Sequence, residues 1–191
     1  PRTEYSIKGK AWLSDLLNRY PEWLVSSAEK LKVDWRSVRP ATVQAWNHVQ
    51  ECFLSGEGRA AKMEFFRDGD ATVVKLPSGR HLLYWNVKRE RTRDGMEISA
   101  SGAYKGGMRR SKLTKGKIFQ NGIQAMAVDV LDSTLIRAEK AGIPTVLHDQ
   151  VMADGTAEHG AKLQEIMEIS PSWLQPGLMK AELEVRERFA K

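Results

Sequence analysis

Residues 119–141 carry the most regular pattern in the chain and place the tightest limit on its fold. Apolar residues recur there at helical spacing and form a stripe, while Arg137, Glu139 and Lys140 are polar. Gly142 and Pro144 follow directly and prevent the helix from continuing. The pattern predicts one long amphipathic helix.

Short extended runs lie on both sides of this helix. Residues 71–76 and 81–87 are rich in strand-forming residues and flank a Pro-Ser-Gly turn, which predicts a hairpin over 71–87. Two apolar runs at 143–147 and 151–153 predict a second hairpin, over 143–154. A helix is predicted to start at residue 157, and the extended run 179–185 predicts a last strand. The C-terminal helix and strand together are expected within residues 157–185.

The N-terminal third has a helical pattern. In residues 40–54, apolar side chains recur every three or four positions, and Gly56 and Gly58 end the pattern. We therefore expect a helical segment over residues 1–62 and a mixed part over residues 63–191. Helices that bracket several hairpins predict an α+β fold with an antiparallel sheet covered by helices on one face.

The positive charge of the chain is concentrated in residues 88–117. The net charge is +6, and this segment holds ten basic residues against three acidic ones, so it contains all of the excess. Such a segment is typical of a surface that binds a polyanion, and a solvated charged loop is the alternative. Its many glycines and weak periodicity predict a segment that is mostly loop, with one short strand near residues 96–100.

Composition excludes several classes of protein. Cys52 is the single cysteine, so the chain forms no internal disulfide, and no apolar run reaches the length of about 18 residues that a membrane span requires. The histidines lack the spacing of zinc ligands. We expect a protein of the cytoplasm, without a membrane partner.

The segment LHDQVMAD, residues 147–154, is the strongest candidate for chemistry. Asp149 follows an apolar strand at the tip of a predicted hairpin, where its carboxylate can bind a hard divalent cation such as Mg²⁺. Two such ions stabilise the attacking and leaving oxygens in phosphoryl transfer. The alternative is an aspartate that only favours the turn.

Several segments, taken in order, resemble the C-terminal part of family A DNA polymerases, especially the phage members. They are DWRSVRPATVQAWNHVQECF, VVKLPSGRHLLYWN, GAYKGGMRRSKLTKGKIFQNGIQAMAVDVL, VLHDQVMAD and IMEISPSWLQPGLMKAE. The resemblance covers residues 34–184. The LPSGR hairpin and the QAMAVD helix are jointly specific at this distance before the His-Asp turn.

The resemblance implies a palm-type sheet and a role for each matching residue. Asp149 becomes the metal-binding carboxylate of motif C in a two-Mg²⁺ site, and His148 lies near the primer terminus. Asn121 and Gln124 contact the minor groove of the primer–template duplex, where all base pairs present acceptors. Without the resemblance, helix capping and a solvated face explain these two residues. The expected phosphate-binding residues are Arg80, Arg109, Arg110, Lys112, Lys115 and Lys117.

The chain departs from the family pattern in two respects. Gln150 stands where the family motif has glutamate, which removes a charge from the metal site. The motif with the first metal-binding aspartate and the nucleotide-binding fingers helix are both absent from the sequence. We therefore expect a fragment, or one piece of a split polymerase, that needs an upstream polymerase region to act on primer–template DNA and dNTP. If the chain is phage-encoded, that action takes place in the cytoplasm of a bacterial host.

Two other functions are compatible with parts of the pattern. A non-catalytic DNA-binding module would use the basic segment alone. A hydrolase would use His148 and Asp149, but the chain offers no motif for a nucleophile.

Overall fold

The computed structural model describes residues 17–92, 95–104, 107–147 and 151–186. The fold is α+β, as predicted, and the chain divides into two compact units, residues 1–122 and 123–191. This division lies within a helix and differs from the expected one at residues 62 and 63. The difference arises because the preceding helix packs on the sheet and belongs to the same unit.

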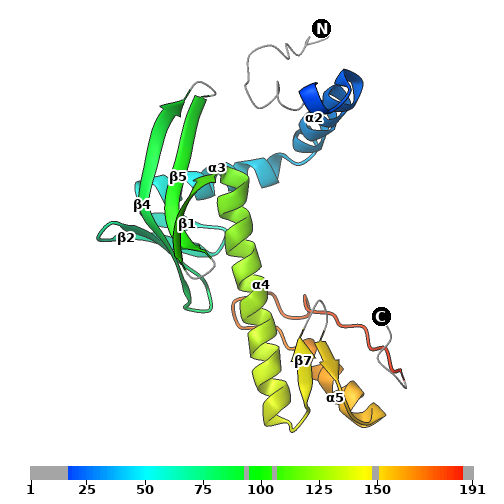
Figure 1. Cartoon of the computed structure of the whole chain (residues 1–191). Helices are drawn as coiled ribbons and strands as arrows, with labels where there is room; N and C mark the ends of the chain where they lie inside the picture. Colours follow the sequence, from blue (N-terminus) through cyan, green and yellow to red (C-terminus); the bar gives the residue numbers. More distant parts are fainter. Residues whose placement is uncertain (1–16, 93–94, 105–106, 148–150, 187–191) are drawn as a thin grey trace. The chain divides into compact units, whose positions relative to one another are not determined.

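The first unit contains a six-stranded antiparallel sheet in which every strand pairs with its neighbour in sequence (Figure 1). Its strands are β1 Gly58–Ala60, β2 Met63–Asp68, β3 Ala71–Lys75, β4 His81–Thr92, β5 Gly95–Tyr104 and β6 Gly107–Leu113. The β3–β4 pairing confirms the hairpin predicted over 71–87. Gly79 adopts φ +93° in its turn, which favours glycine, and Leu76 N–H donates to the Arg80 carbonyl oxygen at 2.8 Å.

Two helices precede the sheet, α2 Glu22–Ser37 and α3 Pro40–Ser55. Proline suits the first turn of α3, because that position needs no N–H donor, and Gly56 ends the helix in a left-handed conformation. Val49, Cys52 and Phe53 are the buried side chains of α3, and Phe53 packs edge-to-face on Tyr84 of β4. One face of the sheet is therefore covered by a helix, as expected.

The side chain of Arg67, from β2, fixes the end of α3. Its Nη2 donates to the Leu54 carbonyl oxygen at 2.9 Å, and its Nη1 donates to the hydroxyl of the fully buried Thr72. These bonds satisfy a carbonyl at the helix end and a buried hydroxyl. They tie the helix to two strands of the sheet.

The prediction that residues 88–117 are mostly loop is wrong. The segment contains the second half of β4, all of β5 and β6, and the start of α4 Lys115–Lys140. Pairing with neighbouring strands satisfies the backbone of these polar residues, although most of their side chains are exposed. A hydrophobic pattern could not reveal β6 and the end of β4, whose side chains mostly face water. Strand β5 contains the short strand predicted near residues 96–100 and is longer than predicted.

The second unit contains most of α4, the strands β7 Thr145–Leu147 and β8 Val151–Ala153, and α5 Ala157–Met167 (Figure 1). The antiparallel β7–β8 pair confirms the hairpin predicted over 143–154. Ala138, Ile143, Leu163 and Ile166 form the buried core of this unit. Among the helices that the structure describes, none combines the length and apolar character needed to cross a bilayer.

The strand predicted over residues 179–185 is wrong. This segment is irregular, and its backbone is bound by side chains of the preceding segment. Gln164 donates to the Ala181 carbonyl oxygen at 2.8 Å, and Ala181 N–H donates to the Glu168 carboxylate at 3.3 Å. These two bonds satisfy backbone groups that a strand neighbour would otherwise bind.

Candidate nucleic-acid interface

The N-terminal half of α4 presents the three residues predicted to contact duplex DNA. Lys117, Asn121 and Gln124 lie four and three residues apart, which places them on one face of the helix. The Thr114 hydroxyl accepts from the Lys117 N–H at 3.2 Å and satisfies one of the free donors of the first turn. Lys117 and Gln124 are exposed, whereas Asn121 is half-buried.

Asn121 is anchored to the sheet. Its Nδ2 donates to the Tyr84 hydroxyl at 3.0 Å, and the Tyr84 ring packs against Phe53 with ring centroids 5.0 Å apart. Nδ2 carries two protons, so one remains for an acceptor outside the protein. The predicted minor-groove contact of Asn121 stays a prediction, and the structure adds a positioning bond that sequence reasoning missed.

The sequence signal that could have identified Tyr84 as a partner of α4 is the alternating pattern of β4. Leu82 and Tyr84 alternate with more exposed neighbours in β4, which identifies them as the side chains that face a helix. Burial raises the pKa of the Tyr84 hydroxyl, and the hydrogen bond from Asn121 opposes part of that rise.

The raised pKa of Tyr84 predicts a loss of stability at alkaline pH. Its contribution is complete below about pH 10, where tyrosine is protonated in both states, and declines as the pH rises toward the folded-state pKa. The limiting slope for one group is about 1.4 kcal/mol per pH unit. In urea unfolding at pH 9, 10 and 11, the free energy of unfolding should fall less steeply with pH for Tyr84→Phe than for the unaltered chain. Tyr20→Phe, at an exposed tyrosine, should follow the unaltered chain, and an identical decline in all three proteins would contradict this prediction.

Gly122 allows α4 to approach β2 closely. A Cβ atom at this position would lie 2.2 Å from Sδ of Met63, a side chain that is 1% exposed. Any larger residue would push the helix away from the sheet or displace Met63. The position of Asn121 against Tyr84 therefore depends on the neighbouring glycine.

Five of the six residues predicted to bind phosphates already have partners within the protein. Arg110 donates to the Ser99 hydroxyl at 2.9 Å and to the Asn86 carbonyl oxygen at 3.0 Å. Lys112 Nζ lies 2.5 Å from the Glu97 carboxylate, and Lys115 Nζ donates to Asn47 Oδ1 at 2.7 Å. Arg80 and Arg109 are exposed, and each also has an interaction partner. The basic segment is thus partly used to hold the sheet together.

The segment predicted to bind metal, residues 148–150, follows β7 and precedes β8 in the chain. The register pairs Leu147 with Val151 and Thr145 with Ala153. His148, Asp149 and Gln150 lie outside the described residues, so their predicted roles stay predictions. Within the described part of the chain, no group of three or more His, Cys, Asp or Glu side chains could hold a metal ion.

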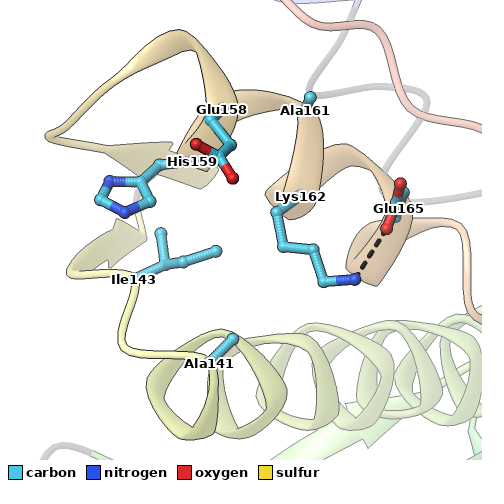
Figure 2. Close-up of a pocket in the computed structure, with 7 residues that line it drawn as sticks. All are labelled: Ala141, Ile143, Glu158, His159, Ala161, Lys162 and Glu165. Atoms are coloured by element: carbon cyan, nitrogen blue, oxygen red, sulfur yellow. Dashed lines mark hydrogen bonds and ion pairs between the residues drawn. The ribbon is translucent and has the colours of Figure 1, made fainter.

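A cleft in the second unit lies along α5 (Figure 2). Its charged lining residues are Glu158, Lys162 and Glu165, and Lys162 Nζ is 2.8 Å from the Glu165 carboxylate. His159 is used in the capping box of α5, in which its N–H donates to the Thr156 hydroxyl at 3.3 Å. These contacts serve the helix, and the cleft brings together none of the predicted site residues.

The chain is similar to a DNA polymerase of Bacillus phage SP02. The two sequences are 31% identical over 134 residues, which cover 63% of this chain and 20% of the polymerase. The aligned part thus spans about a fifth of the length of that relative. No family model matches the chain, and no solved structure matches it. The similarity shows that this chain is related to a phage DNA polymerase over the greater part of its length.

Proposed function

We propose that the chain is the C-terminal palm portion of a template-directed family A DNA polymerase, where it binds the primer–template duplex and supplies one metal-binding carboxylate. The observation that carries the proposal is the similarity to the SP02 DNA polymerase. The order of the resembling segments supports the finer assignment. They include the LPSGR hairpin, the α4 helix and the VLHDQ segment.

The α4 helix would hold the duplex. Lys117 would contact a phosphate, while Asn121 and Gln124 would donate to acceptors in the minor groove. The hydrogen bond to Tyr84 supports this arrangement, because it fixes the orientation of the Asn121 amide before DNA binds. Contacts of this kind read base-pair geometry with little dependence on sequence.

Asp149 would hold Mg²⁺ from the connection between β7 and β8. Mg²⁺ keeps several waters and accepts one or two protein carboxylates, so one aspartate from this chain fits its chemistry. When bound, the two ions would activate the primer 3′-hydroxyl and neutralise the triphosphate. One carboxylate does not position two ions, so a second must come from the upstream polymerase region.

The exposed apolar side chains of α2 support such a partner. Trp23, Leu31 and the C-cap residue Val38 are each about 70% exposed, and Leu24 and Trp35 are each 41% exposed. Large exposed apolar patches mark interaction sites in soluble proteins. We propose that the upstream region of the polymerase covers this side of α2.

The first test is binding of the chain to a labelled primer–template junction, compared with blunt duplex and single strand over a salt series. We expect a preference for the junction that Gln124→Ala weakens. Gln44→Ala is the matched control, because Gln44 is an exposed glutamine on α3. Equal, salt-sensitive binding to every DNA would favour a basic module without catalytic function.

The second test concerns catalysis. The chain alone should incorporate no nucleotides with Mg²⁺ and dNTP. With the upstream region added, primer extension should appear, and Asp149→Asn should abolish it while junction binding persists. Extension by the Asp149→Asn protein at the unaltered rate would contradict the assignment of the metal ligand.

A further inference from the structure

The register of the long strands sorts their charged residues onto two faces of the sheet. Successive residues of a strand point to opposite faces, and residues paired across antiparallel strands share a face. Trp85 pairs with Ser101, so Tyr84 lies on the opposite face from both. Because Asn121 of α4 binds Tyr84, that opposite face is the one next to the start of α4.

Three arginines share the face that carries Tyr84. Arg89 pairs with Ile98, Arg91 pairs with Met96, and Arg109 pairs with Gly102. Ile98, Met96 and Gly102 are even-numbered residues of β5, whereas Ser101 is odd-numbered, so they point to the face opposite Ser101. Among the described residues of β5, of β6 and of the part of β4 that follows Trp85, no carboxylate lies on this face.

The opposite face of the same strands has mixed charge. Lys88 pairs with Ser99, which has the parity of Ser101, and Glu90 pairs with Glu97. Lys112 also lies there and is bound to Glu97, while Arg110 is bound to Ser99 and Asn86. Two carboxylates and several internal bonds therefore offset the positive charge on this face.

Arg89 and Arg91 also lie on a part of the sheet that projects beyond β3. Strand β3 pairs only with residues 81–85 of β4, and a bulge at Asn86, with φ +50°, follows directly. Residues 88–92 then pair with β5 alone. Strand β6 pairs with β5 only from Ile98 onward, so residues 90–92 and 95–97 form a two-stranded arm with Arg89 at its base (Figure 1). Both arginines are exposed there, and among the described residues neither has an ion pair or hydrogen-bond partner for its guanidinium group.

We propose that Arg89 and Arg91 form a phosphate-binding edge for the backbone of duplex DNA, on the same sheet face as Arg109 and the start of α4. The inference rests on the proposed function and assigns the DNA-facing side of the sheet. Guanidinium groups bind phosphate in a bidentate manner, and alternate residues of a strand lie about 6.7 Å apart, about twice the 3.4 Å rise per nucleotide. Arg110 and Lys112 serve the fold and face away from the duplex.

The test compares two double variants that each remove two positive charges from the sheet. The two variants differ in the face from which the charges are removed. Arg89→Gln with Arg91→Gln removes two charges from the proposed face. Lys88→Gln with Lys75→Gln removes two from the other face, because Lys75 pairs with His81 and so lies on the same face as Trp85. We expect the arginine variant to weaken duplex binding at least about fivefold at 0.1 M salt. The salt slope, which is the decrease of log affinity with log salt concentration, should become smaller by about 0.9 per lost phosphate contact. The lysine variant should stay within about twofold of the unaltered chain.

The outcomes separate this inference from the proposed function. If the unaltered chain prefers the junction and both double variants bind equally well, the inference is wrong and the proposed function stands. If the unaltered chain binds no duplex, both are wrong. Arg89→Lys with Arg91→Lys keeps both charges and should keep the salt slope, and loss of the slope in this variant would also overturn the proposal. Circular dichroism should be identical for all variants, because the changed side chains are exposed.

Discussion

Replacing Phe53 with alanine is expected to lower the free energy of unfolding by about 3–5 kcal/mol. The Phe53 side chain has no exposed surface and lies where α3 packs on the sheet. Its ring meets Tyr84 edge-to-face, a geometry that contributes beyond the area it buries. The truncation would remove this pair and leave a cavity beneath the tyrosine that Asn121 binds. Urea unfolding followed by circular dichroism measures the change.

Two further variants test whether burial causes the loss. Leu31→Ala truncates a helical side chain that is 69% exposed, so it should change the unfolding free energy by less than about 0.5 kcal/mol. Phe53→Leu retains most of the apolar volume and should lose less than Phe53→Ala, which provides a measurable variant if alanine prevents folding. Equal losses for Phe53→Ala and Leu31→Ala would contradict the packing of α3 on the sheet.

The sequence predicted the elements whose signals are local. The hairpin over 71–87 has strand formers on both sides of Pro77 and Gly79, so the turn and the strands agree. The long helix was predicted at residues 119–141 and is observed at Lys115–Lys140. Its apolar repeat and the Gly142 stop are contained within the segment itself.

The strands of the basic segment depend on distant partners. In β6, only Leu113 is buried, and the remaining residues through Lys112 are mainly exposed. Such a strand has no apolar alternation, and pairing with β5 satisfies its backbone. The bulge after Trp85 also shifts the register by one residue, which no periodicity in the sequence reveals.

The candidate interface shows the same limit. Helical spacing alone places Lys117, Asn121 and Gln124 on one face of a helix. The hydrogen bond from Asn121 to Tyr84 joins residues 37 positions apart. A partner at that distance follows from the packing of α4 on the sheet, which a single sequence does not specify.

Gly122→Ala is expected to destabilise the protein by about 1–3 kcal/mol, although alanine normally favours a helix over glycine by about 1 kcal/mol. The sign reverses because the new Cβ would lie 2.2 Å from Sδ and 3.1 Å from Cε of Met63. Met63 is almost fully buried, so its side chain has little free space to enter. The helix or the methionine must therefore move.

Gly116→Ala is the matched control, because it makes the same change in the first turn of α4. Its nearest contact would be the Thr114 hydroxyl at 4.0 Å, an ordinary distance, so this variant should be neutral or slightly stabilising. Met63→Ala should cost less in the Gly122→Ala background than alone, with a coupling of about 0.5–3 kcal/mol. Additive effects in this cycle would mean that Gly122 and Met63 do not touch. Coupled effects would establish the close packing that holds Asn121 at Tyr84, on which the proposed duplex-binding face of α4 depends.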